Sequence, residues 1–127
     1  MSSRNIIPPQ PNPETATYWQ AANQGKLMLK RCCDTGTAFY YPRDHSPFTG
    51  GATEWFEASG QATLYSYSIL LRSPAPYCLA YVQLAEGPLM MSNILTEDFN
   101  SLSIGQALRL DFLDSGNGQQ LPVFRPA

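Results

Sequence analysis

The sequence predicts a mostly β protein with an N-terminal helix, a small ribbon-like β lobe and a five-stranded barrel. Two observations predict this architecture. Residues 26–58 hold short extended segments bounded by Gly, Pro or Asp, whereas residues 59–127 hold longer alternating ones. Strands as short as the first set bury too little to form a large independent core. We therefore expect that lobe to need a metal, a disulfide or a docking surface.

Residues 1–25 are predicted to form an extended arm followed by a helix. Four prolines in "IIPPQPNP" favour an extended segment without internal hydrogen bonds. Asn12 is a good helix N-cap, Pro13 suits the first helical position, and Gly25 suits the C-terminal stop. Trp19 lies on one face of this helix with small neighbours, so we expect it to anchor the helix on a core or a partner.

Residues 26–58 are predicted to form the ribbon-like lobe. Its strands are "KLMLKR", "TAFYYP" and "ATEWFEA". Between them, "RCCDTGTAFYYPRDHSPFTGG" has the spacing of two zinc-ribbon knuckles, yet it offers thiolate only at Cys32 and Cys33.

Residues 59–127 are predicted to form the barrel. The strands are "QATLYSYSILLR", "YCLAYVQLAE", "PLMMSNILT", "ALRLDFLD" and "LPVFRPA", with a short helical turn in "EDFNSLSIGQ". A helical element between the third and fourth of five strands fits a small Greek-key barrel of the OB type. The prolines of the last segment predict a closing edge strand.

The chain has few charged residues, and acidic residues slightly outnumber basic ones. Charged residues make up 14% of the chain, against about 25% in typical domains, and the net charge is −2. An acidic chain disfavours nucleic-acid binding, which depends on neutralising phosphates. Four basic residues fall in one window: Lys26, Lys30, Arg31 and Arg43. Such a group suits either a small anionic ligand or a solvated face.

Cysteine usage and hydropathy favour a reduced, cytoplasmic protein. An odd count of three cysteines does not suggest a disulfide framework. The polar, proline-rich start lacks the apolar region of a signal peptide, and no apolar run approaches the roughly 20 residues of a membrane span.

The ordered segments resemble an OB-fold, acyl-CoA-associated family that carries an N-terminal rubredoxin-like zinc ribbon. The resemblance spans nearly the whole chain, through "TYWQAANQGKL", "LKRCCDTG", "YYPRDHSPFTGG", "EWFEASGQATLYSYSIL", "LAYVQLAEGPLMMSNI", "LSIGQALRLDF" and "LPVFRP". "SGQATLYSYS" and "LPVFRP" are its most distinctive parts.

The family pattern has four zinc-binding cysteines in two Cys-x-x-Cys pairs. Carried over by position, they fall at Cys32, Thr35, Ser46 and Thr49. Neutral hydroxyls are poor zinc ligands, so we expect no zinc. A makeshift site from Cys32, Cys33, Asp44 and His45 is the less favoured alternative. We expect aromatic packing to supply much of the cohesion that the metal would give.

The resemblance implies a non-catalytic accessory subunit in a hetero-oligomer. Its partner would be a thiolase-like acyl-CoA enzyme (a thiolase, acyltransferase or aldolase) or a hydratase. The barrel would bind or guide acyl-CoA, with no tightly bound cofactor. Candidate CoA-binding residues are the basic group Lys26, Lys30, Arg31 and Arg43, together with Tyr65, Tyr67, Asn93, Phe124 and Arg125. Ordinary packing or surface roles are the alternative for each.

Two other functions are compatible with the residues. His45, beside Asp44 and downstream of Cys32 and Cys33, allows a Cys–His enzyme, but sequence neighbours do not form a triad. The seven tyrosines allow an OB barrel that stacks nucleic-acid bases. The acidic balance argues against the second.

Overall fold

The structure, a computed structural model, describes residues 6–71 and 74–127. The start of the predicted arm (residues 1–5) and Arg72, at the end of a predicted strand, lie outside the described residues. The elements in chain order are α1 (Ala16–Ala22), β1 (Met28–Cys32), β2 (Ala38–Phe39), β3 (Thr53–Glu57), β4 (Gln61–Leu70), β5 (Tyr77–Leu84), β6 (Leu89–Ile94), the 3₁₀ turn η1 (Phe99–Ser101), β7 (Ala107–Asp114) and β8 (Gln120–Pro126).

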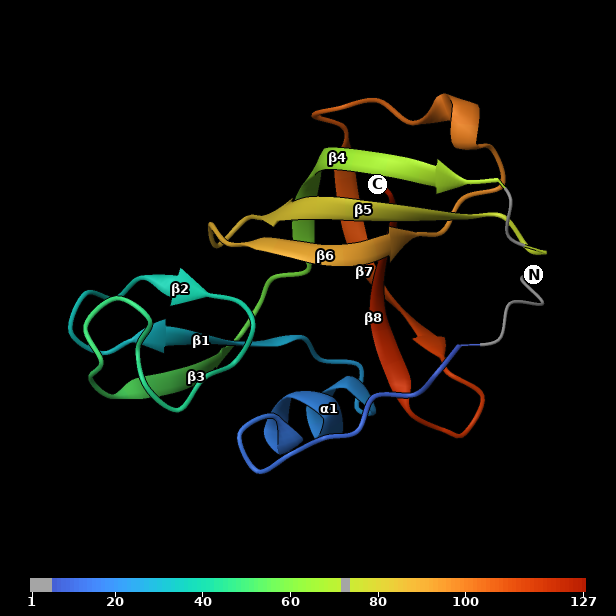
Figure 1. Ribbon diagram of the computed structural model, residues 1–127. Helices are drawn as coiled ribbons and strands as arrows, with labels where there is room; N and C mark the ends of the chain where they lie inside the picture. The colour runs from blue at the N-terminus through green and yellow to red at the C-terminus, as the bar shows by residue number, and fades with distance from the viewer. Residues whose placement is uncertain (1–5, 72–73) are drawn as a thin grey trace.

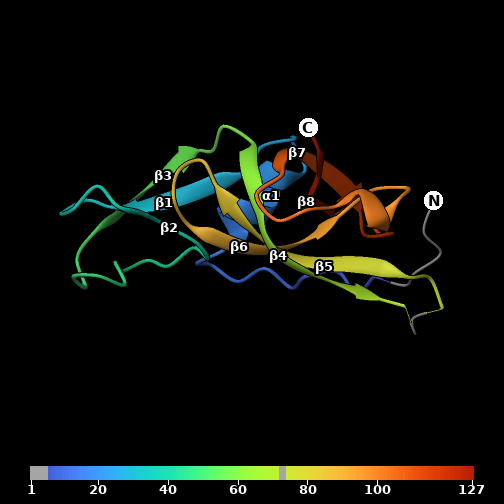
Figure 2. The ribbon, with the colours of Figure 1, turned by 90° about the horizontal axis from the view of Figure 1, so that it is seen from above.

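The strands form two sheets. β1 lies between β2 and β3 in a small antiparallel sheet, and the remaining strands close into a barrel in the order β4-β5-β6-β8-β7. Figure 1 shows the small sheet beside the barrel, with α1 below both, and Figure 2 shows the same arrangement from above. The predicted mostly β fold with a five-stranded OB barrel is confirmed.

The helix begins later than predicted. The side chain of Asn12 accepts a hydrogen bond from the Thr15 amide (3.0 Å), and the Thr15 hydroxyl accepts one from the Asn12 amide (3.1 Å). Asn12 therefore caps a preceding turn, and the helix starts at Ala16. Gly25, at φ +77°, ends it as predicted. Within the described part of the chain, no helix is long and apolar enough to cross a membrane.

The helix is anchored mainly by Tyr18, which is 1% exposed. Trp19, the predicted anchor, is only partly buried against the same core, and its indole N–H donates to the Tyr41 hydroxyl at 2.8 Å. The end of α1 is tied to the last hairpin, because the Gln120 amide donates to the Asn23 side chain at 2.8 Å. The helix thus contacts segments nearly a hundred residues away.

One hydrophobic core joins the helix, the small sheet and the barrel. Tyr18, Leu27 and the β1 residue Leu29 belong to the same buried cluster as barrel residues such as Val82 and Phe124. The short strands of the small sheet bury too little to form a core of their own. They are therefore stabilised by packing on the barrel.

The last strand has neighbours on both sides. β8 pairs antiparallel with β7 over its whole length, but it meets β6 through one parallel pair, Ile94 with Phe124. The prediction of an edge strand is therefore wrong in the closed barrel. Pro122 and Pro126 are tolerated because the seam with β6 is so short that few ladder hydrogen bonds are lost there.

Candidate functional site

The predicted basic group is largely engaged within the protein. Lys30 is 6% exposed, and its ammonium donates to the Thr53 hydroxyl at 3.1 Å. The same ammonium lies 3.7 Å from an Asp44 carboxylate oxygen and 4.7 Å from the centre of the Trp55 ring. Lys30 therefore serves the small sheet, through an ion pair with the exposed carboxylate of Asp44 and a cation–π contact, instead of facing a ligand.

The other basic residues of the group point elsewhere. Adjacent strand residues face opposite sides, so Arg31 turns away from Lys30 and lies 3.0 Å from Glu54. Arg43 lies 3.5 Å from Glu14. Lys26 is exposed at the end of the helix connection. The structure does not bring the four cations together as one patch for the CoA phosphates.

The first of the two predicted tyrosines, Tyr65, lies at a bulge in β4, whereas Tyr67 is regularly paired. Tyr65 is 54% exposed on the outside of the barrel. The hydroxyl of Tyr67 donates to the carbonyl of Leu102 at 3.2 Å, which holds its ring at the end of the barrel. Asn93 donates to the carbonyl of Cys78 at 3.0 Å. None of these three side chains lines either of the two cavities described below.

The closing strand supplies one buried and one surface candidate. Phe124 is fully buried in the core, where an external ligand cannot reach it. Arg125 is paired with Asp111, and this hydrogen bond is the main cause that lowers the pKa of the Asp111 carboxyl. Arg125 also lines a cavity of about 460 Å³ with Tyr77 and Phe99. Of the nine candidates, it has the most pocket-like surroundings.

A larger cavity, of about 710 Å³, lies at the other end of β5. Gln61, Leu84, Leu108 and Arg109 are among its lining residues, which come from β4, β5 and β7. Sequence reasoning missed it, because residues far apart in the chain meet there only after the barrel closes.

The outer face of β4, β5 and β6 was also missed. None of the residues in these three strands is Asp, Glu, Lys or Arg. Their outward side chains include the largely apolar Tyr65, Tyr81 and Met91, with exposed fractions of 54%, 47% and 53%, together with Leu79 and Leu89. Tyr81 and Met91 are directly opposite one another on β5 and β6. The absence of charged residues from three successive strands was the sequence signal that could have indicated this face.

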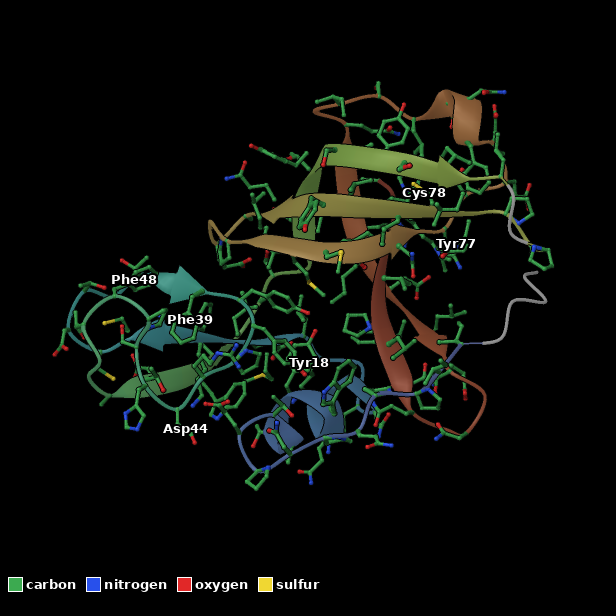
Figure 3. All side chains as sticks on the ribbon, viewed as in Figure 1. Tyr18, Phe39, Asp44, Phe48, Tyr77 and Cys78 are labelled. Atoms are coloured by element: carbon green, nitrogen blue, oxygen red, sulfur yellow. The ribbon has the colours of Figure 1, made fainter. Side chains whose placement is uncertain are left out.

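The four positions predicted from the zinc pattern do meet. The Cys32 sulfur lies 3.6 Å from the Thr49 hydroxyl and is hydrogen-bonded by Ser46 and Thr35. The hydrogen bond from Ser46 is the largest cause that lowers the pKa of the Cys32 thiol to about 6. Beside this cluster the rings of Phe39 and Phe48 stack edge to face, with centroids 6.1 Å apart (Figure 3).

The alternative site at His45 is not assembled. Across residues 6–71 and 74–127, no three His, Cys, Asp or Glu side chains gather closely enough to hold a metal ion. The carboxylate of Asp44 instead lies near the Lys30 ammonium. The same arrangement gives no support to a Cys–His catalytic pair.

Comparison with known proteins gives two family matches. Residues 55–113 match the C-terminal OB-fold domain of ChsH2, and residues 19–46 match the rubredoxin-like zinc ribbon domain of ChsH2. Together they cover most of the small sheet and most of the barrel.

Individual relatives extend this likeness. The chain is 32% identical to a probable enoyl-CoA hydratase alpha subunit of Thermomonospora curvata, over 94% of the chain but only 39% of that relative. It is 30% identical to a DUF35 domain-containing scaffold protein of Methanothermobacter thermautotrophicus, over 78% of the chain and 81% of the relative.

Solved structures give the same picture. A chain of an Ltp2-ChsH2(DUF35) aldolase matches with a TM-score of 0.85 and 31% identity, over 94% of this chain and 98% of that one. A DUF35 protein of unknown function from Sulfolobus solfataricus matches at 14% identity with a TM-score of 0.67, which supports the fold alone.

Proposed function

The chain belongs to the DUF35 family, with the zinc-ribbon and OB-fold domains of ChsH2, and on that premise we propose that it is an accessory subunit of a thiolase-like acyl-CoA enzyme. In this role it is not catalytic alone, and it helps to bind or guide acyl-CoA. The observation that carries the proposal is the match to a chain of a structure named as an Ltp2-ChsH2(DUF35) aldolase, which covers 98% of that chain.

The uncharged outer face of β4, β5 and β6 is the proposed docking surface for the partner enzyme. The centres of protein interfaces are depleted in charge and enriched in Tyr and Met, as this face is. An exposed apolar patch of this kind on a small domain marks an interaction site. The partner surface that fits it is correspondingly apolar and poor in charge, because a buried charge opposite it would lack a partner.

Acyl-CoA is the proposed ligand of the assembled complex. The cavity beside Arg125 combines apolar walls from Tyr77 and Phe99 with the carboxylate of Glu97 and with a guanidinium that is paired with Asp111. Its apolar walls and polar groups suit the amide-rich arm of CoA more than its phosphates. The free cysteines Cys32, Cys33 and Cys78 are consistent with a reducing compartment, and we propose a cytoplasmic location.

A hydratase is the second candidate partner. The observation that favours it is the likeness to a probable enoyl-CoA hydratase alpha subunit, of which this chain spans 39%. Nucleic-acid binding is disfavoured further by β4, β5 and β6, because these strands offer no Lys or Arg to contact phosphates.

Co-purification tests this function. A tagged chain, isolated from its native source, is expected to bring a thiolase-like acyl-CoA enzyme in fixed stoichiometry, identified by mass spectrometry. Replacing Met91 with Lys or Tyr81 with Lys should abolish recovery, because each change puts a charge in the docking face. Ile104→Lys is the matched control, since Ile104 is 63% exposed but lies outside the three strands.

The outcomes separate the function from the surface. Recovery of a hydratase subunit instead would favour the second candidate. Equal recovery with Met91→Lys and wild type would leave the accessory role intact and refute this docking face. No acyl-CoA enzyme with the wild-type chain would refute the proposed function itself.

A further inference from the structure

Two turns of the small lobe have the same backbone pattern. The Gly36 amide donates to the Cys32 carbonyl at 2.7 Å, and the Gly50 amide donates to the Ser46 carbonyl at 2.9 Å. In each turn the amide of the first residue donates to the carbonyl five residues later, at 2.9 Å. Both glycines have positive φ, at 73° and 76°. The two zinc-ribbon knuckles are therefore preserved as a pair.

The side chains held by these turns do not fit the zinc ion of the family. Structural zinc sites use four thiolate or imidazole ligands, and these turns offer one cysteine sulfur and three hydroxyls. A Ser or Thr hydroxyl keeps its proton near neutral pH and is a weak ligand. The acidic side chain of Asp34, in the first turn, accepts a hydrogen bond from the Thr49 hydroxyl at 2.7 Å. Its charge is thus used within the protein.

The hydroxyls instead satisfy the polar groups of the turns. Ser46 accepts hydrogen bonds from the amides of Phe48 and Thr49, at 3.0 and 3.2 Å. Thr49 accepts one from the Gly51 amide at 3.1 Å. Thr49 also gives its own hydroxyl proton to the Asp34 carboxylate, and its oxygen lies 3.6 Å from the sulfur of Cys32 in the other turn. Amides that would otherwise be unpaired in tight turns are paired without a metal.

We propose that Cys32, Thr35, Ser46 and Thr49 form a thiol–hydroxyl cluster that ties the two knuckles together in place of zinc. The contact of Cys32 with Thr49 joins residues 17 positions apart, as a metal ion would, and Cys32 is fully buried. The lobe then folds and docks on the barrel without metal. This inference does not depend on which enzyme is the partner.

Metal analysis of the purified chain is the first test. After expression in zinc-supplemented medium, the wild type is expected to carry far less than one zinc per chain. Its melting temperature should be the same with added zinc and with a chelator, because a ligand that binds only the folded state raises stability. Near-stoichiometric zinc, or a fall in melting temperature with the chelator, would overturn the proposal.

A gain-of-metal variant tests the geometry. Thr35→Cys, Ser46→Cys and Thr49→Cys together are expected to create a four-thiolate site that binds one Co(II), with the absorption bands of tetrahedral cobalt, and to make the melting temperature depend on metal. A folded triple variant that binds no cobalt would contradict the convergence of these positions.

Single substitutions keep the test decisive if the triple variant does not fold. Ser46→Ala removes the hydroxyl that accepts two turn amides, so its melting temperature should fall clearly below that of wild type. Thr37→Val is the matched control, because this exposed residue lies in the same lobe but outside the cluster. Equal melting temperatures for the two variants would refute the cluster as the tie between the knuckles.

Discussion

Cys32 and Cys33 are neighbours whose thiols have opposite surroundings. Cys32 is fully buried in the cluster of hydroxyls, whereas Cys33 is exposed. Cys78 is buried in the barrel, and burial raises the pKa of its thiol. The hydrogen bonds that lower the pKa of Cys32 favour its thiolate, but an electrophile must also reach the sulfur. Access therefore decides reactivity at these three positions.

We predict that Cys33 reacts first with a thiol-specific reagent. Under native conditions one thiol per chain should be labelled quickly near neutral pH, and peptide mapping should find the label on Cys33. All three cysteines should react after unfolding in guanidinium chloride. Cys33→Ser is the control, and it should abolish the fast phase. Rapid native labelling of Cys32 would contradict the burial of its sulfur.

The contacts of individual site residues were the hardest feature to predict from the sequence. The sequence groups Lys30, Arg31 and Arg43, but it does not show that each has a carboxylate nearby. Those partners depend on strand register and on the approach of the N-terminal segment, which are long-range properties. Phe124 shows the same limit, since alternation identifies a strand but not which face closes on the core.

Among the elements, α1 depends most on packing. It is seven residues long, too short to be stable in water by itself. Tyr18 and Ala22 place one face of this helix against the core, and the ring of Tyr18 packs on those of Trp19 and Tyr41. The helix therefore exists because its aromatic face is buried.

We predict that Tyr18→Ala destabilises the protein by about 3–5 kcal/mol, the usual cost of truncating a buried aromatic ring. Tyr18→Phe should cost about 1 kcal/mol or less, because the contact of its hydroxyl with Tyr40 is long, at 3.5 Å. Urea unfolding measures both. The control is Gln20→Ala on the exposed side of the helix, which should change stability by less than about 0.5 kcal/mol.

Elements were more predictable than their ends and neighbours. The barrel strands and the short helical turn follow from period-two alternation and turn residues, which are local signals. The start of α1 was wrong by a few residues because Asn12 and Thr15 bond to each other. The pairing of β8 with both β6 and β7 depends on barrel closure, which no local sequence pattern encodes.

At the scale of the whole molecule, the two sheets are two parts of one folding unit. Leu29 of β1, 1% exposed, belongs to the same buried cluster as the barrel residues. Loss of the barrel core would remove the surface on which the small sheet packs. The reverse also holds, because the helix and β1 cover one part of the barrel.

We predict a single cooperative unfolding transition. Trp19 and Trp55, the only two tryptophans of the sequence, report on the helix and the small sheet by fluorescence, while far-ultraviolet circular dichroism is dominated by the barrel. Both curves should coincide. Leu29→Ala should move them together, by about 2–5 kcal/mol, whereas Ile104→Ala on the surface should move neither. Separate transitions would show that the lobes unfold independently.

The hydrogen bonds between Asn23 and the last hairpin also bear on how the protein is made. They join residues 96 and 97 positions apart, and Gln119 reaches back to the carbonyl of Trp19 at 3.1 Å. At about 5–20 residues per second, a ribosome takes on the order of 5 to 20 seconds to extend the chain from one partner to the other. During that interval the aromatic face of α1 has no finished barrel to cover it. The nascent chain is then a natural client for chaperones that shield apolar segments until synthesis is complete.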